Sequence, residues 1–212
     1  MRSEAKSRIY EYRLICPTQS SFEKATQLVN SSENIFAIHE SDTDADVDED
    51  CCGRIDESAA VAKDAVLSHR YLMHEQNAWC LPSPLNIAAM QQAADVLRND
   101  SQETDYTSFR NSGCNSVSPI RKVLNISVSQ VPTGESEFYP ESNTILITVE
   151  ATSFLLRMVR NFVAVMVHVG QGKASPEIAA KYLELRDRNA IKLKPAPAEG
   201  LYLKDVIYDE EG

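Results

Sequence analysis

The sequence lacks the long apolar runs of membrane proteins and the cysteine spacing of disulfide or zinc frameworks. No run of about 18 uninterrupted apolar residues occurs, so no membrane span is expected. Residues 1–8 contain no apolar stretch of the kind that a signal peptide needs. The five cysteines are odd in number and include no Cys-x-x-Cys pair, which favours a reducing compartment. We therefore expect an intracellular protein; a mitochondrial, nuclear or cytoplasmic location is left open.

Acidic charge is in excess, but it is concentrated in one segment. The net charge of the 212 residues is −10, and residues 40–57 hold nine acids and one base, or −8. Residues 154–194 hold eight bases and three acids, or +5, which gives modest support for an anionic partner. The acidic segment has almost no aromatic residues and is typical of a solvated, disordered loop. Its Asp42-x-Asp44-x-Asp46 spacing resembles a calcium loop, but Val47 stands where the sharp turn needs glycine, so we predict no metal.

With 43% hydrophobic residues, the chain is long enough to bury a full core. The expected organisation is a first strand and helix in residues 1–37, an acidic insert in 38–68, and an α/β domain in 69–212. Ile9–Cys16 alternates as a strand does and ends at Pro17, and Phe22–Val29 has the pattern of a short helix.

The later segments alternate between helix and strand patterns. Ser83 is the predicted N-cap of a helix that ends near Asn99, with Pro84 in its first turn. A second helix runs from Phe154 to a stop at residues 170–172, and Ser175-Pro176-Glu177 caps a third. Strands are predicted at residues 121–131, 144–150 and 201–208. This order predicts an α+β domain with a mostly antiparallel sheet and packed helices.

The predicted helix from Phe154 is unusual because it carries arginine into an apolar pattern. Nearly every position from Phe154 to Val169 is apolar, yet Arg157 and Arg160 interrupt the run. Arginine is almost never fully buried unless something pairs with it, so this helix calls for a carboxylate, a phosphate or a nucleic-acid backbone nearby. A structural ion pair to a neighbouring element is the alternative.

Four blocks of sequence carry a family resemblance. They are Arg8-x-Tyr10-x-Tyr12, Asp105-Tyr-Thr-Ser-Phe109 with Ser118-Pro-x-Arg121, Ser153-Phe154-x-x-x-Met158-Val159-Arg160-Asn161, and Ala196-Pro-Ala-x-Gly200-Leu-Tyr-Leu203. In this order and spacing the chain resembles the tRNA pseudouridine synthase A family. Trp79-x-Leu-Pro together with Ser118-Pro119 is similar to its eukaryotic branch.

The resemblance implies base isomerisation in tRNA, in which the glycosidic bond of uridine breaks, the base rotates, and it is rejoined through carbon. It implies an aspartate nucleophile and neither metal nor cofactor. Arg160 matches the arginine that pairs with the aspartate, and Tyr10 matches a tyrosine that stacks beside the target base. Packing on the sheet is an equally weighted alternative for Tyr10. Phe154 and Leu201 would line the pocket. The candidates for phosphate contact are Arg8, Arg121, Lys122 and Arg157, and for these a solvated-surface role weighs at least as much.

The sequence departs from the family at the nucleophile. No Arg-Thr-Asp motif occurs in these residues, so the chain resembles the carboxyl-terminal half of a synthase catalytic fold. The first hypothesis is a tRNA pseudouridine synthase represented by this half. The second is a catalytically inactive remnant or subunit that binds RNA. The third is an interaction protein whose acidic loop recruits a basic partner. An uncovered sheet edge would also allow a homodimer.

Overall fold

The computed structural model describes residues 5–24, 26–27, 77–111, 113–131 and 142–208, and within them it contains one six-stranded sheet. The strand order is β2-β1-β5-β4-β3, and β6 also pairs with β1. All pairings between these strands are antiparallel except β1 with β2. The strands are β1 (Ala5–Pro17), β2 (Trp79–Cys80), β3 (Glu103–Asp105), β4 (Ile120–Val131), β5 (Ser142–Ala151) and β6 (Leu201–Tyr208). The predicted α+β fold with a mostly antiparallel sheet is confirmed.

Strand β1 is central because three other strands pair with it. Its whole length from Arg8 onward faces β5, while its other edge pairs with β6 up to Tyr12 and with β2 at Leu14 and Ile15. In a strand, successive side chains point to opposite faces. Tyr12 and Leu14 accordingly belong to the core. The predicted strand at Ile9–Cys16 is therefore confirmed and is longer than its pattern indicated.

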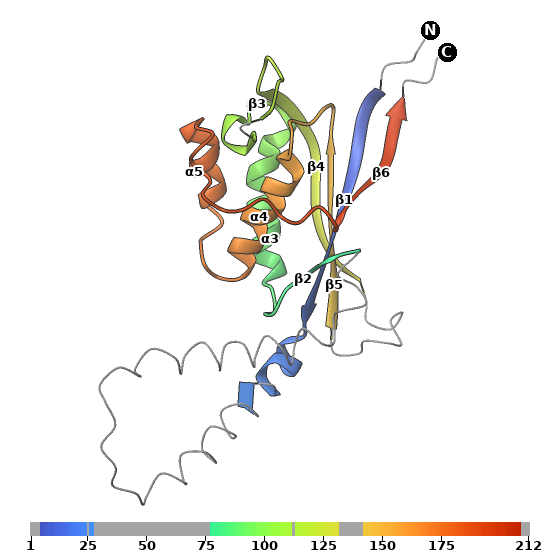
Figure 1. Cartoon of the computed structure of the whole chain (residues 1–212), viewed down its shortest axis with the longest axis vertical. Helices are drawn as coiled ribbons and strands as arrows, with labels where there is room; N and C mark the ends of the chain where they lie inside the picture. Colours follow the sequence, from blue (N-terminus) through green and yellow to red (C-terminus); the bar gives the residue numbers. More distant parts are fainter. Residues whose placement is uncertain (1–4, 25, 28–76, 112, 132–141, 209–212) are drawn as a thin grey trace, which may run out of the picture.

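Three helices lie on one side of the sheet (Figure 1). They are α3 (Ile87–Arg98), α4 (Met158–Gly170) and α5 (Ile178–Leu185), with α5 packed on the outside of α3. Helix α4 is buried along almost its whole length, and Phe162 at its centre makes aromatic contacts with Tyr106 and Phe109. The rings of Phe109 and Phe162 meet edge to face at 4.9 Å, the arrangement that aromatic quadrupoles prefer. This cluster joins α4 to the short 3-10 helix η2 (Thr107–Phe109).

The predicted start of the second helix at Phe154 is wrong. Helix α4 begins at Met158, and Arg157 lies before it in the left-handed region with φ 61°. Residues 155–158 form a turn closed by a bond from the Met158 amide to the Leu155 carbonyl at 3.1 Å. The apolar run continues through this turn because Leu155 is itself buried, so hydrophobicity alone gave no boundary.

One predicted helix cap is also wrong. Asn86, not Ser83, is the N-cap of α3, because its Oδ1 accepts the Ala89 amide at 3.1 Å. The amide of Asn86 in turn donates to the Gly170 carbonyl at 2.9 Å, which ties the start of α3 to the end of α4. At α5 the N-cap is Glu177, the last of the three predicted capping residues, although its side chain makes no cap bond. Helix α3 ends where predicted, at left-handed Asn99, and α5 ends at left-handed Arg186.

The remaining predictions for the chain divide by what the structure describes. The three later strands are confirmed as β4, β5 and β6. Residues 19–24 and 26–27 are helical, so the predicted helix at Phe22 begins three residues earlier. The acidic insert at 38–68 lies outside the described residues. Among the residues described, no helix is both long enough and apolar enough to cross a membrane.

Candidate nucleotide site

Arg160 lies in the first turn of α4 and is held by residues 196–200, the segment that leads into β6. Its Nε donates to the carbonyl oxygen of Ala196, and the amide of Ala196 donates to the Arg160 carbonyl at 3.1 Å. Within the described part of the chain, neither Nη atom of Arg160 has a hydrogen-bond partner and no carboxylate pairs with it. The half-buried guanidinium therefore keeps one fork of donors for an acceptor.

Tyr12 fixes the same segment one residue further along. Its side chain is fully buried, and its hydroxyl donates to the Pro197 carbonyl at 2.7 Å. Burial raises the pKa of Tyr12, and the nearby charge of Arg160 only partly opposes this rise. The phenol consequently stays protonated at neutral pH and acts as a hydrogen-bond donor.

Gly200 allows this segment to approach β1 closely. An ideal Cβ built at Gly200 would lie 2.8 Å from the Arg13 carbonyl oxygen and 2.8 Å from the Tyr12 ring. The Arg13 amide donates to the Gly200 carbonyl at 2.9 Å. The chain then enters β6 with Leu201 paired opposite Tyr12. Only a residue without a side chain fits at this crossing.

Two of the predicted pocket residues are in direct contact. The rings of Tyr10 and Phe154 meet edge to face, with centroids 5.0 Å apart and an interplanar angle of 88°. Both are half-buried and pack against the core, as does Leu201 on β6. Tyr10 and Tyr12 belong to the same side of β1, as their two-residue spacing predicts. The structure thus brings three predicted pocket residues to the side of the sheet that carries Arg160.

The predicted phosphate-contacting residues behave in two ways. Arg8 donates to the Thr152 carbonyl at 3.5 Å, and the Thr152 amide donates to the carbonyl of exposed Lys122 at 3.1 Å. Exposed Arg157 follows five residues after Thr152, so these three cations lie near the end of β5. Arg121 differs, because its guanidinium is used within its own loop. It donates to the Ser118 and Ile120 carbonyls at 2.9 and 2.6 Å and to the Ser116 hydroxyl at 2.7 Å.

Polar contacts hold the turn before α4 in place. Asn161 is buried and its Nδ2 donates to the Phe109 carbonyl at 2.8 Å. The Asn111 amide donates to the Leu156 carbonyl at 3.3 Å. Buried Arg110 donates to the carbonyls of Cys114 and Ser116 and so closes the loop that follows η2. These bonds fix the position from which Arg157 and Arg160 emerge.

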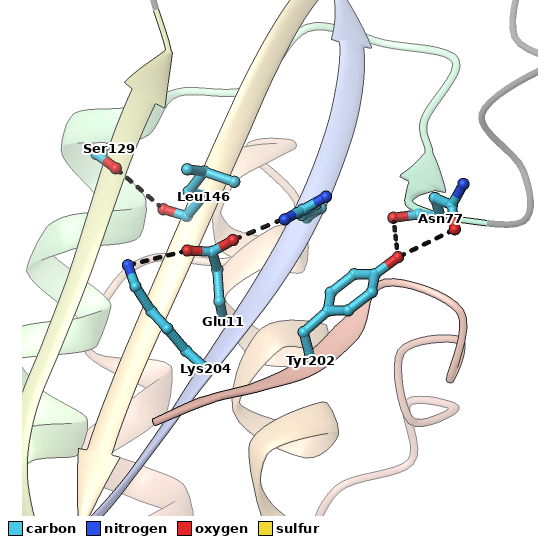
Figure 2. A network of polar contacts seen from close by, with 7 residues as sticks. Glu11, Asn77, Ser129, Leu146, Tyr202 and Lys204 are labelled. Atoms are coloured by element: carbon cyan, nitrogen blue, oxygen red, sulfur yellow. Dashed lines mark hydrogen bonds and ion pairs between the residues drawn. The ribbon is translucent and has the colours of Figure 1, made fainter. Parts of the chain in front are cut away.

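The opposite face of the sheet, which no helix of the described residues covers and which we call the uncovered face, carries a separate polar network (Figure 2). Glu11 pairs with Lys204 at 3.1 Å and with Arg13 at 3.3 Å. Burial raises the pKa of Glu11, but the hydrogen bonds from Lys204 and Arg13 outweigh it, so the pKa lies below 4.5. The guanidinium of Arg13 also lies 4.6 Å from the ring centroid of Tyr202, whose hydroxyl donates to the Asn77 carbonyl at 2.9 Å.

A surface cavity of about 430 Å³ lies at the opposite end of α4 from Arg160. It is lined in part by Asn86, Ala89 and Gly170. Arg160 and Gly170 are ten residues apart in one helix, which corresponds to about 15 Å along its axis. Among the described residues, no group of histidine, cysteine, aspartate or glutamate side chains is arranged to hold a metal ion.

Sequence reasoning missed two residues of this arrangement and half-recognised a third. Glu11 stood between two tyrosines and gave no sign of burial, because its partner Lys204 is 193 residues away. Arg110 gave no sign of burial either, because the groups that accept from it are the backbone carbonyls of Cys114 and Ser116. The resemblance included Tyr12 as one member of a tyrosine pair, without a role. The signal for Tyr12 in the sequence is its two-residue spacing from Tyr10, which places both side chains on the same face of the predicted strand.

Comparison with known proteins gives consistent matches. A family model described as tRNA pseudouridine synthase matches residues 103–209, half of the chain. The tRNA pseudouridine synthase A of Pseudothermotoga lettingae is 40% identical over 131 residues, covering 62% of this chain and 48% of that protein. That of Roseobacter denitrificans is 36% identical over 131 residues, covering 62% and 46%. The chain spans about half the length of these relatives.

Proposed function

The chain belongs to the tRNA pseudouridine synthase family, and we propose that it forms part of an active site that isomerises uridine to pseudouridine in tRNA. The observation that carries this proposal is the free Nη fork of Arg160, on the side of the sheet where Tyr10 and Phe154 meet. This half-buried guanidinium lacks a carboxylate partner among the described residues, and its two Nη donors are arranged to bind one. Membership in the carboxyl-terminal half and in a eukaryotic-like branch stays a prediction.

In the proposed reaction, the acceptor for Arg160 is the nucleophilic aspartate. A carboxylate in a dry pocket is pushed toward its neutral form, and an adjacent guanidinium opposes this by favouring the charged form. Because no Arg-Thr-Asp motif occurs in these 212 residues, the aspartate would come from residues outside them. The net change is an isomerisation: the N1–C1′ bond breaks, a C5–C1′ bond forms, C5 releases its proton to the solvent, and N1 takes up a proton.

Tyr10, Phe154 and Leu201 are proposed to hold the uridine once it leaves the RNA helix. A flat ring stacks on any extruded base, and the edge-to-face contact with Phe154 fixes the plane of the Tyr10 ring. Arg8, Lys122 and Arg157 are proposed to contact phosphates, which fix position and carry no sequence information. Arg121 is a weaker candidate because three groups of its own loop already accept from its guanidinium.

A second candidate function is binding of tRNA without catalysis, as a remnant or a subunit. The absence of the Arg-Thr-Asp motif from these residues favours it. The two candidates predict the same salt-sensitive binding, because phosphate contacts release counterions. The two candidates differ in whether uridine isomerisation occurs once a protein segment with the nucleophilic aspartate is added.

The experiment measures release of tritium from tRNA that carries [5-³H]uridine, because forming the bond to C5 expels that hydrogen. The 212-residue chain is assayed alone and together with the part of the Pseudothermotoga lettingae relative that lies outside the matched 48%, where the family resemblance implies the Arg-Thr-Asp motif. Release only in the mixture supports the enzyme. Salt-sensitive tRNA binding without release supports the second candidate. A chain that does not bind tRNA and does not release tritium would contradict both candidates.

The expected homodimer is also a proposal. Among the described strands, β6 pairs only with β1, and it exposes Leu203, Ile207 and Tyr208 by 55%, 37% and 53%. An apolar edge strand of this kind is a template for strand pairing. Sedimentation equilibrium would give a dimer mass if the edge self-associates, and a monomer mass would contradict the proposal.

A further inference from the structure

We propose that Tyr12 positions Arg160 by fixing the carbonyl that the guanidinium binds. Arg160 Nε and the Tyr12 hydroxyl donate to two successive carbonyls, those of Ala196 and Pro197. No contact between the two side chains is needed, because they hold the same short segment. The catalytic meaning of this positioning rests on the proposed function; the coupling between the two residues does not.

The segment has few other anchors. The Ala196 amide donates to the Arg160 carbonyl, which joins it to α4. Gly200 joins it to β1 through the Arg13 amide and lies against the Tyr12 ring. Pro197 has no amide hydrogen, so its carbonyl is the polar group through which it is held. The hydrogen bond from the Tyr12 hydroxyl to the Pro197 carbonyl therefore sets the distance between the Ala196 carbonyl and β1.

The orientation of Arg160 follows from that carbonyl. A guanidinium is planar, so binding Nε in one direction fixes the direction of both Nη donors. If the Pro197 carbonyl loses its partner, the segment gains freedom and the Arg160 fork no longer has a single orientation. Tyr12 is thus a positioning residue that does not touch the substrate.

The test uses Tyr12→Phe, which removes only the hydroxyl. The chain offers a matched control in Tyr106→Phe, since Tyr106 is also fully buried and its hydroxyl also donates to a backbone carbonyl, that of Leu97, at 2.7 Å. Both variants lose one buried hydrogen bond. Only Tyr12→Phe removes one from the segment that holds Arg160.

The readout is hydrogen exchange of the Arg160 Nε–H in ¹⁵N spectra of the 212-residue chain, with the signal assigned by its loss in Arg160→Lys. We expect exchange about ten-fold faster in Tyr12→Phe, the factor that corresponds to one ordinary hydrogen bond, and an unchanged rate in Tyr106→Phe. Equal protection of Arg160 in Tyr12→Phe and in wild type would overturn the proposal. So would equal acceleration in both variants.

Two further measurements keep the result interpretable. Gly200→Ala disturbs the same segment from its other end and should also speed Arg160 exchange, which decides the matter if Tyr12→Phe does not fold. In the mixture that releases tritium, Tyr12→Phe should lower kcat without raising KM for tRNA. An inactive wild type would contradict the proposed function alone, because the exchange rate is read without substrate.

Discussion

The two faces of the sheet use the same strands for different purposes. On the face covered by helices, β1 contributes Tyr12, whose hydroxyl and ring organise the segment beside Arg160. On the uncovered face, the neighbouring residue Glu11 joins Lys204 and Arg13 in a network whose cations are about half exposed. In the part of the chain that the structure describes, the covered face therefore combines a dry core with the unpaired Nη fork of Arg160, whereas Glu11, Lys204 and Arg13 on the uncovered face pair with one another.

This difference separates charges that stabilise the fold from charges that are available to a ligand. Arg13 and Lys204 have a carboxylate partner, and Arg121 has partners in its own loop. Arg160 has a single bond through Nε and a free Nη fork in the described part of the chain. The role of an arginine in an apolar pattern can be inferred only when its partners are known. Here the partners distinguish arginines that stabilise the fold from the arginine that is available to a ligand.

The largest expected effect comes from removing an aromatic side chain on the covered face. Phe162→Ala deletes a fully buried ring that contacts Tyr106 and Phe109, and we expect a loss of about 3–5 kcal/mol in the free energy of unfolding. Leu146→Ala on the uncovered face should cost only about 1 kcal/mol because that side chain is already half exposed. Urea denaturation measures both. Equal losses would contradict the comparison of the two faces.

A smaller effect is expected where the segment crosses β1. Gly200→Ala places a methyl group 2.8 Å from the Arg13 carbonyl oxygen and the Tyr12 ring, so it should cost about 1–3 kcal/mol. Gly113→Ala is the control, because its added Cβ would meet only the Asn111 side chain at 3.7 Å. Thermal unfolding compares the two variants. A Gly200→Ala protein as stable as the control would mean that the segment is not pressed against Tyr12.

The smallest effect concerns the uncovered face and depends on pH. The folded-state pKa of Glu11 is lowered, so its contribution to stability is present above the ordinary pKa of 4.5 and is lost as pH falls through the folded value. Glu11→Gln should therefore cost a few tenths of a kcal/mol, up to about 1, at pH 7, with the difference from wild type shrinking toward pH 3. Lys204→Gln should weaken the same dependence. A difference that grows on acidification would contradict the sign of the shift.

The sequence predicted most elements of this fold because burial on one face of a strand leaves a period of two. Strand β5 shows this alternation in its burial, whereas β1 is buried at every position from Leu14 to Pro17 and β6 is half-buried or exposed throughout. The buried helix α4 carries an apolar run. The start of α4 was not predictable from hydrophobicity, since Leu155 in the preceding turn is buried too. The left-handed Arg157 marks the boundary, and that conformation depends on packing with the loop at Asn111.

The candidate site was predictable only in part, for a related reason. Arg160 could be picked out because it interrupts an apolar pattern, and Tyr10 because it matches a residue of the family resemblance. Their partners could not, because the Ala196 carbonyl is a backbone group that no residue type reveals. Likewise, the residue types around Arg121 did not indicate that residues 116–120 would accept hydrogen bonds from its guanidinium, since two of the three acceptors are backbone carbonyls.

The central claim is that Arg160, and not Arg121, is the arginine that awaits the carboxylate. The measurement is the initial rate of tritium release from [5-³H]uridine tRNA by the mixture of this chain and the segment that supplies the Arg-Thr-Asp motif. Arg160→Ala should lower kcat by about 10²–10³-fold, the loss typical of removing one charge-stabilising group from an active site. Arg121→Ala should leave kcat within a factor of about three, the equivalent of about 0.65 kcal/mol. Release that is unaffected by Arg160→Ala, or reduced equally by both variants, would contradict the account.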